Sequence, residues 1–93
     1  KAFVEGFTKR YGARPGTFEA LGYDSASLVL AALKTGTTPE AVCNGLKAIK
    51  DLDAVTGRIT INGDGDAVKS AVILKIAKDG DKYTTRYVET VAP

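Results

Sequence analysis

Residues 22–36 have the sequence GYDSASLVLAALKTG, the longest apolar segment of the chain. From Leu28 to Leu33 it is apolar on nearly every helical face, whereas a surface helix is usually apolar along one stripe. Such a helix must be covered on several sides, and a chain of 93 residues supplies few elements to do so. The segment is therefore either the core of a compact domain or a central helix of a larger protein.

The composition is ordinary for a globular protein and argues against several chemistries. Of the residues, 44% are hydrophobic and 26% charged, and the net charge of +2 comes without a basic run that would track phosphates. No apolar stretch reaches the 18 residues of a membrane span. The chain has no histidine, the usual general base and commonest metal ligand, and its single Cys43 excludes an internal disulfide. We expect no enzyme activity, no cofactor, no metal and no nucleic-acid partner.

The segment before residue 22 predicts a helix and a turn. Phe3, Phe7 and Tyr11 recur at four-residue spacing, and Gly12 is placed for a left-handed helix end. No capping side chain precedes this pattern, so we expect the chain to begin inside, or at the edge of, a helix of a longer polypeptide. After the turn at residues 13–17, residues 18–22 suit either a short buried strand or the lead-in to the apolar helix. Asp24 or Ser25 is expected to cap that helix.

A third helix is predicted after Gly36. Thr38 and Pro39 form a helix start, followed by Glu40 near the positive end of the helix dipole. Its expected buried stripe consists of Val42, Leu46 and Ile49. Cys43 lies beside this stripe, and we expect a small buried or half-buried thiol without reactivity.

From Asp51 onward the periodicity changes from helix to strand. Residues 58–62 alternate, residues 70–77 are rich in β-branched side chains, and Lys78–Asp81 predicts a hairpin turn into a strand over 82–90. In that last strand the alternation places five side chains on one face: Tyr83, Thr85, Tyr87, Glu89 and Val91. The predicted architecture is three helices followed by two or three β-strands.

Three polar clusters have residue types found in functional sites, and each favours a structural role. Asn62, Asp64 and Asp66 alternate like the start of a calcium loop, but Ala67 and Ile73 occupy the positions that require Gly and Glu, so a solvated turn is favoured. Glu19 and Asp24 could form a carboxylate pair, although helix-cap and surface roles are favoured. Tyr83 and Tyr87 lie near basic residues, as in sheets that stack bases, although packing is the commoner role.

The order of these features resembles the C-terminal part of type I periplasmic binding proteins, in particular the branched-chain amino acid (Leu/Ile/Val) receptors of ABC transporters. The resemblance covers essentially the whole chain and rests on co-occurrence and spacing of Tyr11-Gly12, Pro15, Gly22-Tyr23-Asp24-Ser25-Ala26, Leu30–Lys34, Gly36, Thr38-Pro39-Glu40, Leu46, Val55-Thr56-Gly57-Arg58-Ile59, Asn62–Asp66 and Lys78-Asp79-Gly80. The family's usual Tyr-Asp-Ala is Tyr-Asp-Ser here, and its usual Phe-Asp before the glycine–aspartate turn is Ile61-Asn62.

The resemblance implies an α/β fold, as one part of a protein with two lobes joined by three crossovers that close on a small ligand. Residues 1–70, three helices and a strand, would belong to the N-terminal lobe. Residues 71–93 would form the last hinge crossover, within or just before the Ala71–Ile76 strand, and the terminal hairpin. The apolar helix would then owe its missing partners to sequence outside this chain.

The resemblance also implies a ligand-binding wall at the head of the apolar helix. Ala20 aligns with a cleft-facing residue that is aromatic in some relatives, and Leu21 and Tyr23 lie next to it. The alternative role for Tyr23 is a buried ring that holds the helix start. The implied function is delivery of a small amino acid or related carboxylate to an ABC-transporter membrane permease, with a periplasmic, extracellular or lipid-anchored location. The alternative is an autonomous small α+β protein-interaction domain whose last hairpin offers an edge strand.

If the chain is part of a receptor, it should expose its apolar helix and bind apolar dye or self-associate when isolated. By itself it should not bind solute tightly, because a cleft needs both walls.

Overall fold

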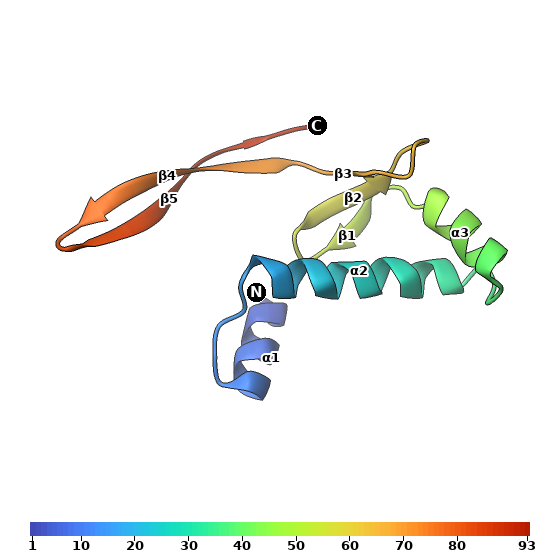
Figure 1. Ribbon diagram of the computed structural model, residues 1–93, viewed down its shortest axis with the longest axis horizontal. Coiled ribbons are helices and arrows are strands. Elements are labelled where there is room, and N and C mark those ends of the chain that lie inside the picture. Colours follow the sequence, from blue (N-terminus) through green and yellow to red (C-terminus); the bar gives the residue numbers. More distant parts are fainter.

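The computed structural model describes all 93 residues as three helices and five strands. The elements are α1 (Ala2–Tyr11), α2 (Thr17–Leu33), α3 (Pro39–Lys47), β1 (Leu52–Ala54), β2 (Gly57–Ile61), β3 (Ala67–Val68), β4 (Ala71–Asp79) and β5 (Lys82–Val91). Strands β1, β2 and β3 form a small antiparallel sheet, and β4 and β5 form a separate hairpin. In Figure 1, α2 runs alongside the small sheet, and α1 and α3 adjoin the two ends of α2. The β4–β5 hairpin projects away from these helices and the small sheet. No helix is both long and apolar enough to cross a membrane.

Helix α2 begins at Thr17, well before the predicted cap at Asp24 or Ser25. The start is stabilised by Glu19, whose carboxylate accepts a hydrogen bond from the backbone N–H of Gly16 at 2.9 Å. The prediction of a cap at Asp24 or Ser25 is therefore wrong, and so is the strand alternative for residues 18–22. Ser25 instead donates its hydroxyl to the carbonyl of Leu21 within the helix, at 2.8 Å.

The other helix boundaries follow the sequence signals. Gly12 ends α1 in the left-handed conformation with φ 73°. Thr38 caps α3 by accepting the N–H of Ala41 at 3.2 Å. Of the predicted stripe, Ile49 is buried and Val42 and Leu46 are half-buried.

The expectation of a buried or half-buried thiol at Cys43 is wrong, because this side chain is exposed. Cys43 is turned by about 100° from the half-buried Val42 and lies one helical turn before the exposed Lys47.

The core is small and centres on the contact between α2 and α3. Ala32 of α2 is 1% exposed and faces the buried Gly45 of α3. A methyl group at Gly45 would lie 2.7 Å from the Thr35 hydroxyl oxygen and 2.8 Å from the Ala32 carbonyl oxygen. The absence of a side chain at residue 45 is therefore what lets the two helices approach.

Helix α2 retains an uncovered apolar surface. Leu28 is half-buried, whereas Val29, Leu30 and Leu33 are 43%, 64% and 38% exposed. The expectation of an apolar helix with partners missing agrees with this exposure. Burial of such side chains stabilises a protein by about 1.5–3 kcal/mol each, and that stabilisation is largely absent here.

The β4–β5 hairpin turns at Gly80, which has φ 62°, and its loop is the two residues between the paired Asp79 and Lys82. A β-bulge interrupts the pairing, because Ile73 pairs with Glu89 while Leu74 pairs with Tyr87.

The bulge overturns the prediction that Tyr83, Thr85, Tyr87, Glu89 and Val91 share one face. Neighbouring residues of a strand face opposite sides, so the partners of Ile73 and Leu74 do so too, and Glu89 lies opposite Tyr87. Thr90 joins Tyr87 instead, and their hydroxyl oxygens are 3.0 Å apart.

Candidate functional site

The three residues predicted to contact a ligand lie near the start of α2, but they do not form one surface. Ala20 and Tyr23 are three residues apart and share a helix face, whereas Leu21 is turned by about 100° from Ala20. Ala20 and Leu21 are half-buried, and Tyr23 is 54% exposed. The structure thus separates Leu21 from the other two.

Tyr23 joins a row of aromatic side chains that fastens α1 to α2. Its ring centre lies 4.9 Å from that of Phe3, in a tilted arrangement. The row continues along α1 through Phe3–Phe7 at 5.9 Å and Phe7–Tyr11 at 4.6 Å. The ring of Tyr23 is therefore not buried, but it does hold the start of α2 against a neighbouring helix.

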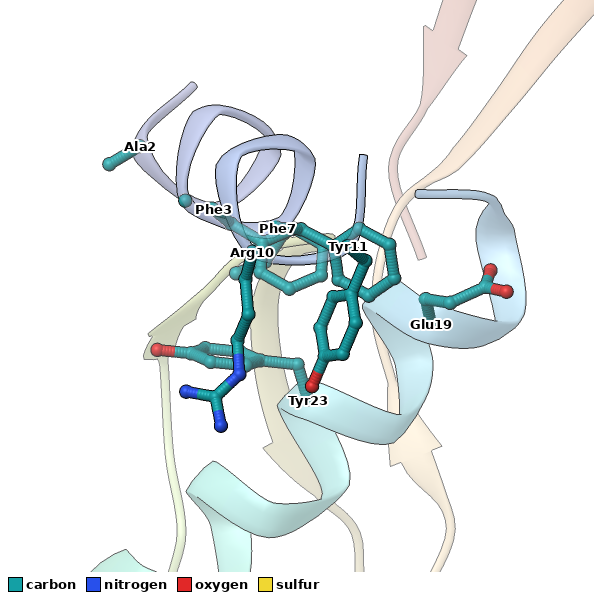
Figure 2. Close-up of a pocket in the computed structure, with 9 residues that line it drawn as sticks. Ala2, Phe3, Phe7, Arg10, Tyr11, Glu19 and Tyr23 are labelled. Atoms are coloured by element: carbon teal, nitrogen blue, oxygen red, sulfur yellow. The ribbon is translucent and has the colours of Figure 1, made fainter. Parts of the chain in front are cut away.

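The same rings line an open cavity of about 680 Å³ between α1 and α2. Figure 2 shows Arg10 extending beside these rings, with its guanidinium carbon 5.8 Å from the Tyr11 ring centre. The Glu19 carboxylate points away from the rings and binds Gly16. Chemically, this cavity offers aromatic walls for an apolar group.

Phe18 is the residue at the head of α2 that sequence reasoning missed. It is 86% exposed, although it is a large aromatic side chain. It lies three residues before Leu21, so these two share a helix face distinct from that of Ala20 and Tyr23. The signal was a Phe next to the expected ligand wall, and the strand interpretation of residues 18–22 hid it.

Asp24 is the most buried polar residue, at 2% exposure, although it was expected at a helix cap. Its carboxylate accepts the N–H of Val55 at 2.8 Å, the N–H of Thr56 at 2.9 Å and the Thr56 hydroxyl at 2.6 Å. The two residues that supply these three donors, Val55 and Thr56, form the turn between β1 and β2. Asp24 therefore joins α2 to the small sheet across more than thirty residues of sequence.

The pKa of Asp24 is lowered by this environment. Burial opposes ionisation, but the hydroxyl and N–H of Thr56, the N–H of Val55 and the positive charge of Lys69 together outweigh it. The ammonium group of Lys69 donates a hydrogen bond to the Thr56 hydroxyl oxygen at 2.9 Å. The Thr56 hydroxyl thus stands between a carboxylate and an ammonium group.

The acidic loop folds around the side chain of Asn62. Its amide oxygen accepts the N–H of Asp64 at 3.0 Å and the N–H of Asp66 at 2.9 Å. The chain contains no group of three His, Cys, Asp or Glu side chains placed to hold a metal ion. This loop makes a turn that leads from β2 into β3.

Comparison with known proteins gives one family and two similar solved structures. The profile of the family described as periplasmic binding protein matches residues 1–81. The crystal structure of a leucine binding protein, LivK, from Thermotoga maritima has a TM-score of 0.80 and 29% identity, over 99% of this chain and 26% of that one. The isoleucine complex of LivJ, a branched-chain amino acid transporter substrate binding protein of Streptococcus pneumoniae, has a TM-score of 0.78 and 31% identity, over 94% and 25%.

No curated protein matches the sequence. The chain spans about a quarter of the length of the two structures that it matches. The predicted α/β fold class and the predicted resemblance are confirmed by these comparisons.

Proposed function

The chain belongs to the periplasmic binding protein family, and from this premise we propose that it forms part of an extracytoplasmic receptor for a small amino acid. The observation that carries the proposal is the similarity of fold, over nearly the whole chain, to a leucine binding protein and to a branched-chain amino acid binding protein in complex with isoleucine. The uncovered face of α2 supports it, because Val29, Leu30 and Leu33 then pack against other parts of the receptor.

The proposed ligand class is an amino acid with an aliphatic side chain. One similar structure is of a leucine binding protein and the other of a branched-chain amino acid binding protein, and this chain is about equally similar to each. The head of α2 offers apolar groups to such a ligand. We propose contacts for Ala20 and Tyr23 on one face of this helix end, and for Leu21 and Phe18 on the neighbouring face, where the ring of Phe18 is exposed at the first turn.

The receptor would act by lobe closure rather than by chemistry. Ligand would select the closed arrangement of two lobes, with residues 1–70 in one lobe and the hairpin of residues 71–93 reaching the other. Delivery of the ligand to the permease of an ABC transporter follows from this role. The two similar structures are of binding proteins rather than enzymes, which supports a role without catalysis.

A thermal-shift panel of the twenty amino acids tests this proposal on the longer polypeptide that contains the chain. A ligand that binds only the folded state stabilises it by about 2.7 kcal/mol at a concentration 100-fold above the Kd. We expect Tm to rise with leucine, isoleucine or valine and to stay constant with aspartate and lysine.

The variant Ala20→Trp should abolish the shift, whereas Ala26→Trp, at an exposed position of the same helix, should retain it. A panel without any shift, or one in which the charged amino acids alone shift Tm, would contradict the proposal.

A further inference from the structure

Three polar side chains form a continuous relay from α2 to the point where the chain leaves the small sheet. We define the relay as Asp24, Thr56 and Lys69. Thr56 donates its hydroxyl proton to the Asp24 carboxylate at 2.6 Å, and Lys69 donates to the same hydroxyl oxygen at 2.9 Å. A hydroxyl has one proton and two lone pairs, so both bonds form at once with their directions fixed.

Lys69 occupies a special place in the topology. Strand β3 ends at Val68 and β4 begins at Ala71, so residues 69 and 70 connect the helices and small sheet to the hairpin. Strands β4 and β5 pair only with each other. The direction of the hairpin is therefore decided largely at this connection (Figure 1).

The relay binds this connection to α2 rather than only to the neighbouring strand. Strand β3 is two residues long and pairs with β2 through Thr60–Val68 and Ile61–Ala67. Such a short ladder holds the connection weakly, whereas Lys69 is half-buried and bound to a hydroxyl that is itself bound to a carboxylate at 2% exposure. Hydrogen bonds to charged groups are stronger than neutral ones.

We propose that Lys69 is a positioning residue that, through Thr56 and Asp24, fixes the direction in which the chain leaves the small sheet relative to α2. The relay ends next to Tyr23, so the exit direction is linked to the head of α2. Its consequence for ligand affinity rests on the proposed receptor function, whereas the fixed direction itself does not.

Spin-label distance measurements on the longer polypeptide test the proposal. The labels are placed on Cys43, which is exposed on α3, and on Asp81→Cys at the hairpin tip, with cysteines outside residues 1–93 replaced by serine. Without ligand, Thr56→Val and Lys69→Met should each broaden or displace the distance distribution. Lys69→Met removes one hydrogen bond to a charged group, and Thr56→Val removes two. Loss of one such bond changes the equilibrium between the fixed and the unfixed exit direction by roughly tenfold.

Thr56→Ser is the rescue variant, because it keeps the hydroxyl and should keep the narrow distribution. Lys75→Met is the matched control, since Lys75 is exposed on β4 and outside the relay. Unchanged distributions in Thr56→Val and Lys69→Met would overturn the proposal. Equal broadening in Thr56→Ser or in Lys75→Met would overturn it as well.

The same variants separate this proposal from the receptor function. The distance measurement needs no ligand, so it supports or overturns the relay even where no amino acid shifts Tm. Where leucine or isoleucine does bind, Thr56→Val and Lys69→Met should change its Kd while Thr56→Ser leaves it unchanged. A Kd that equals the wild-type value in all three variants would overturn the link between the relay and the head of α2.

Discussion

Asp24 shows how one residue acquires a role that its neighbours in sequence do not reveal. In the sequence it stands before an apolar run, where an aspartate commonly caps a helix. In the structure it lies within α2, and its carboxylate closes the turn between β1 and β2 by binding Val55 and Thr56. Those donors lie 31 and 32 residues further along the chain, beyond the reach of any local rule.

Replacement of Asp24 by Asn should lower stability at neutral pH. The amide keeps one acceptor oxygen, so either the Val55 N–H or the two Thr56 donors lose their partner in a part-buried site, which costs about 1–3 kcal/mol. The carboxylate has a lowered pKa, so the folded state binds fewer protons than the unfolded state. Its stabilising effect is therefore fully present above the ordinary pKa of 3.8 and is lost as the pH falls through the folded-state pKa.

Urea unfolding of the longer polypeptide, with and without the replacement, measures this effect. The difference between wild type and Asp24→Asn should be largest at pH 7 and should shrink below the ordinary pKa of 3.8. Asp53→Asn, at an exposed residue of β1, is the control and should change little at either pH. A difference for Asp24→Asn that is equal at pH 7 and pH 3 would show that the charge contributes nothing.

At the level of elements, the α2–α3 contact depends on the absence of a side chain. Gly45→Ala would place a methyl group 2.8 Å from the Ala32 carbonyl oxygen and 3.0 Å from its Cα atom. Alanine favours a helix by up to about 1 kcal/mol over glycine, but overpacking against backbone costs about 1–3 kcal/mol. We expect net destabilisation, because the backbone of α2 cannot move aside as a flexible side chain would.

Gly6→Ala is the matched comparison for this prediction. Gly6 lies within α1, and no atom stands within 4 Å of the position of an added methyl group. It should be neutral or stabilising by up to about 1 kcal/mol. The thermal unfolding midpoint of Gly45→Ala should therefore fall, whereas that of Gly6→Ala should stay constant or rise. A rise of the midpoint in Gly45→Ala would contradict the tight contact between α2 and α3.

Sequence patterns predicted the elements that carry their own local signals. The αL glycine at residue 12, the Thr38 cap and the Gly80 turn each determine a boundary through neighbouring residues, and the structure confirms them. Strands β1 and β3 are three and two residues long, too short for an alternating pattern to be visible. The bulge opposite Ile73 and Leu74 escaped prediction because alternation along β5 carries no information about its register with β4.

The candidate site was predicted only in part, because the sequence pattern did not show where α2 begins. The resemblance led to the head of α2, but the faces of Ala20, Leu21 and Tyr23 depend on where the helix begins. Glu19 moves that beginning to Thr17, because it reaches back to Gly16. The exposed ring of Phe18 follows from this start and could not be foreseen from a strand interpretation. The assignment of ligand contacts stays a prediction.

At the level of the whole molecule, an extended shape of 54 × 32 × 16 Å and an uncovered α2 fit a part of a larger α/β fold. The family match over residues 1–81 and the two similar structures favour this account over an autonomous interaction domain. One wall of a cleft cannot enclose a solute. If the proposed receptor function holds, this chain alone should consequently bind amino acids far more weakly than a receptor with both lobes.

The central claim is most directly tested by isothermal titration calorimetry of leucine, isoleucine and valine into the longer polypeptide and, separately, into this chain. The account predicts saturable binding of at least one of them to the longer polypeptide, its loss in Ala20→Trp, and no micromolar binding to the chain alone. Absence of heat with all three amino acids, or binding of equal strength to the chain alone, would contradict it.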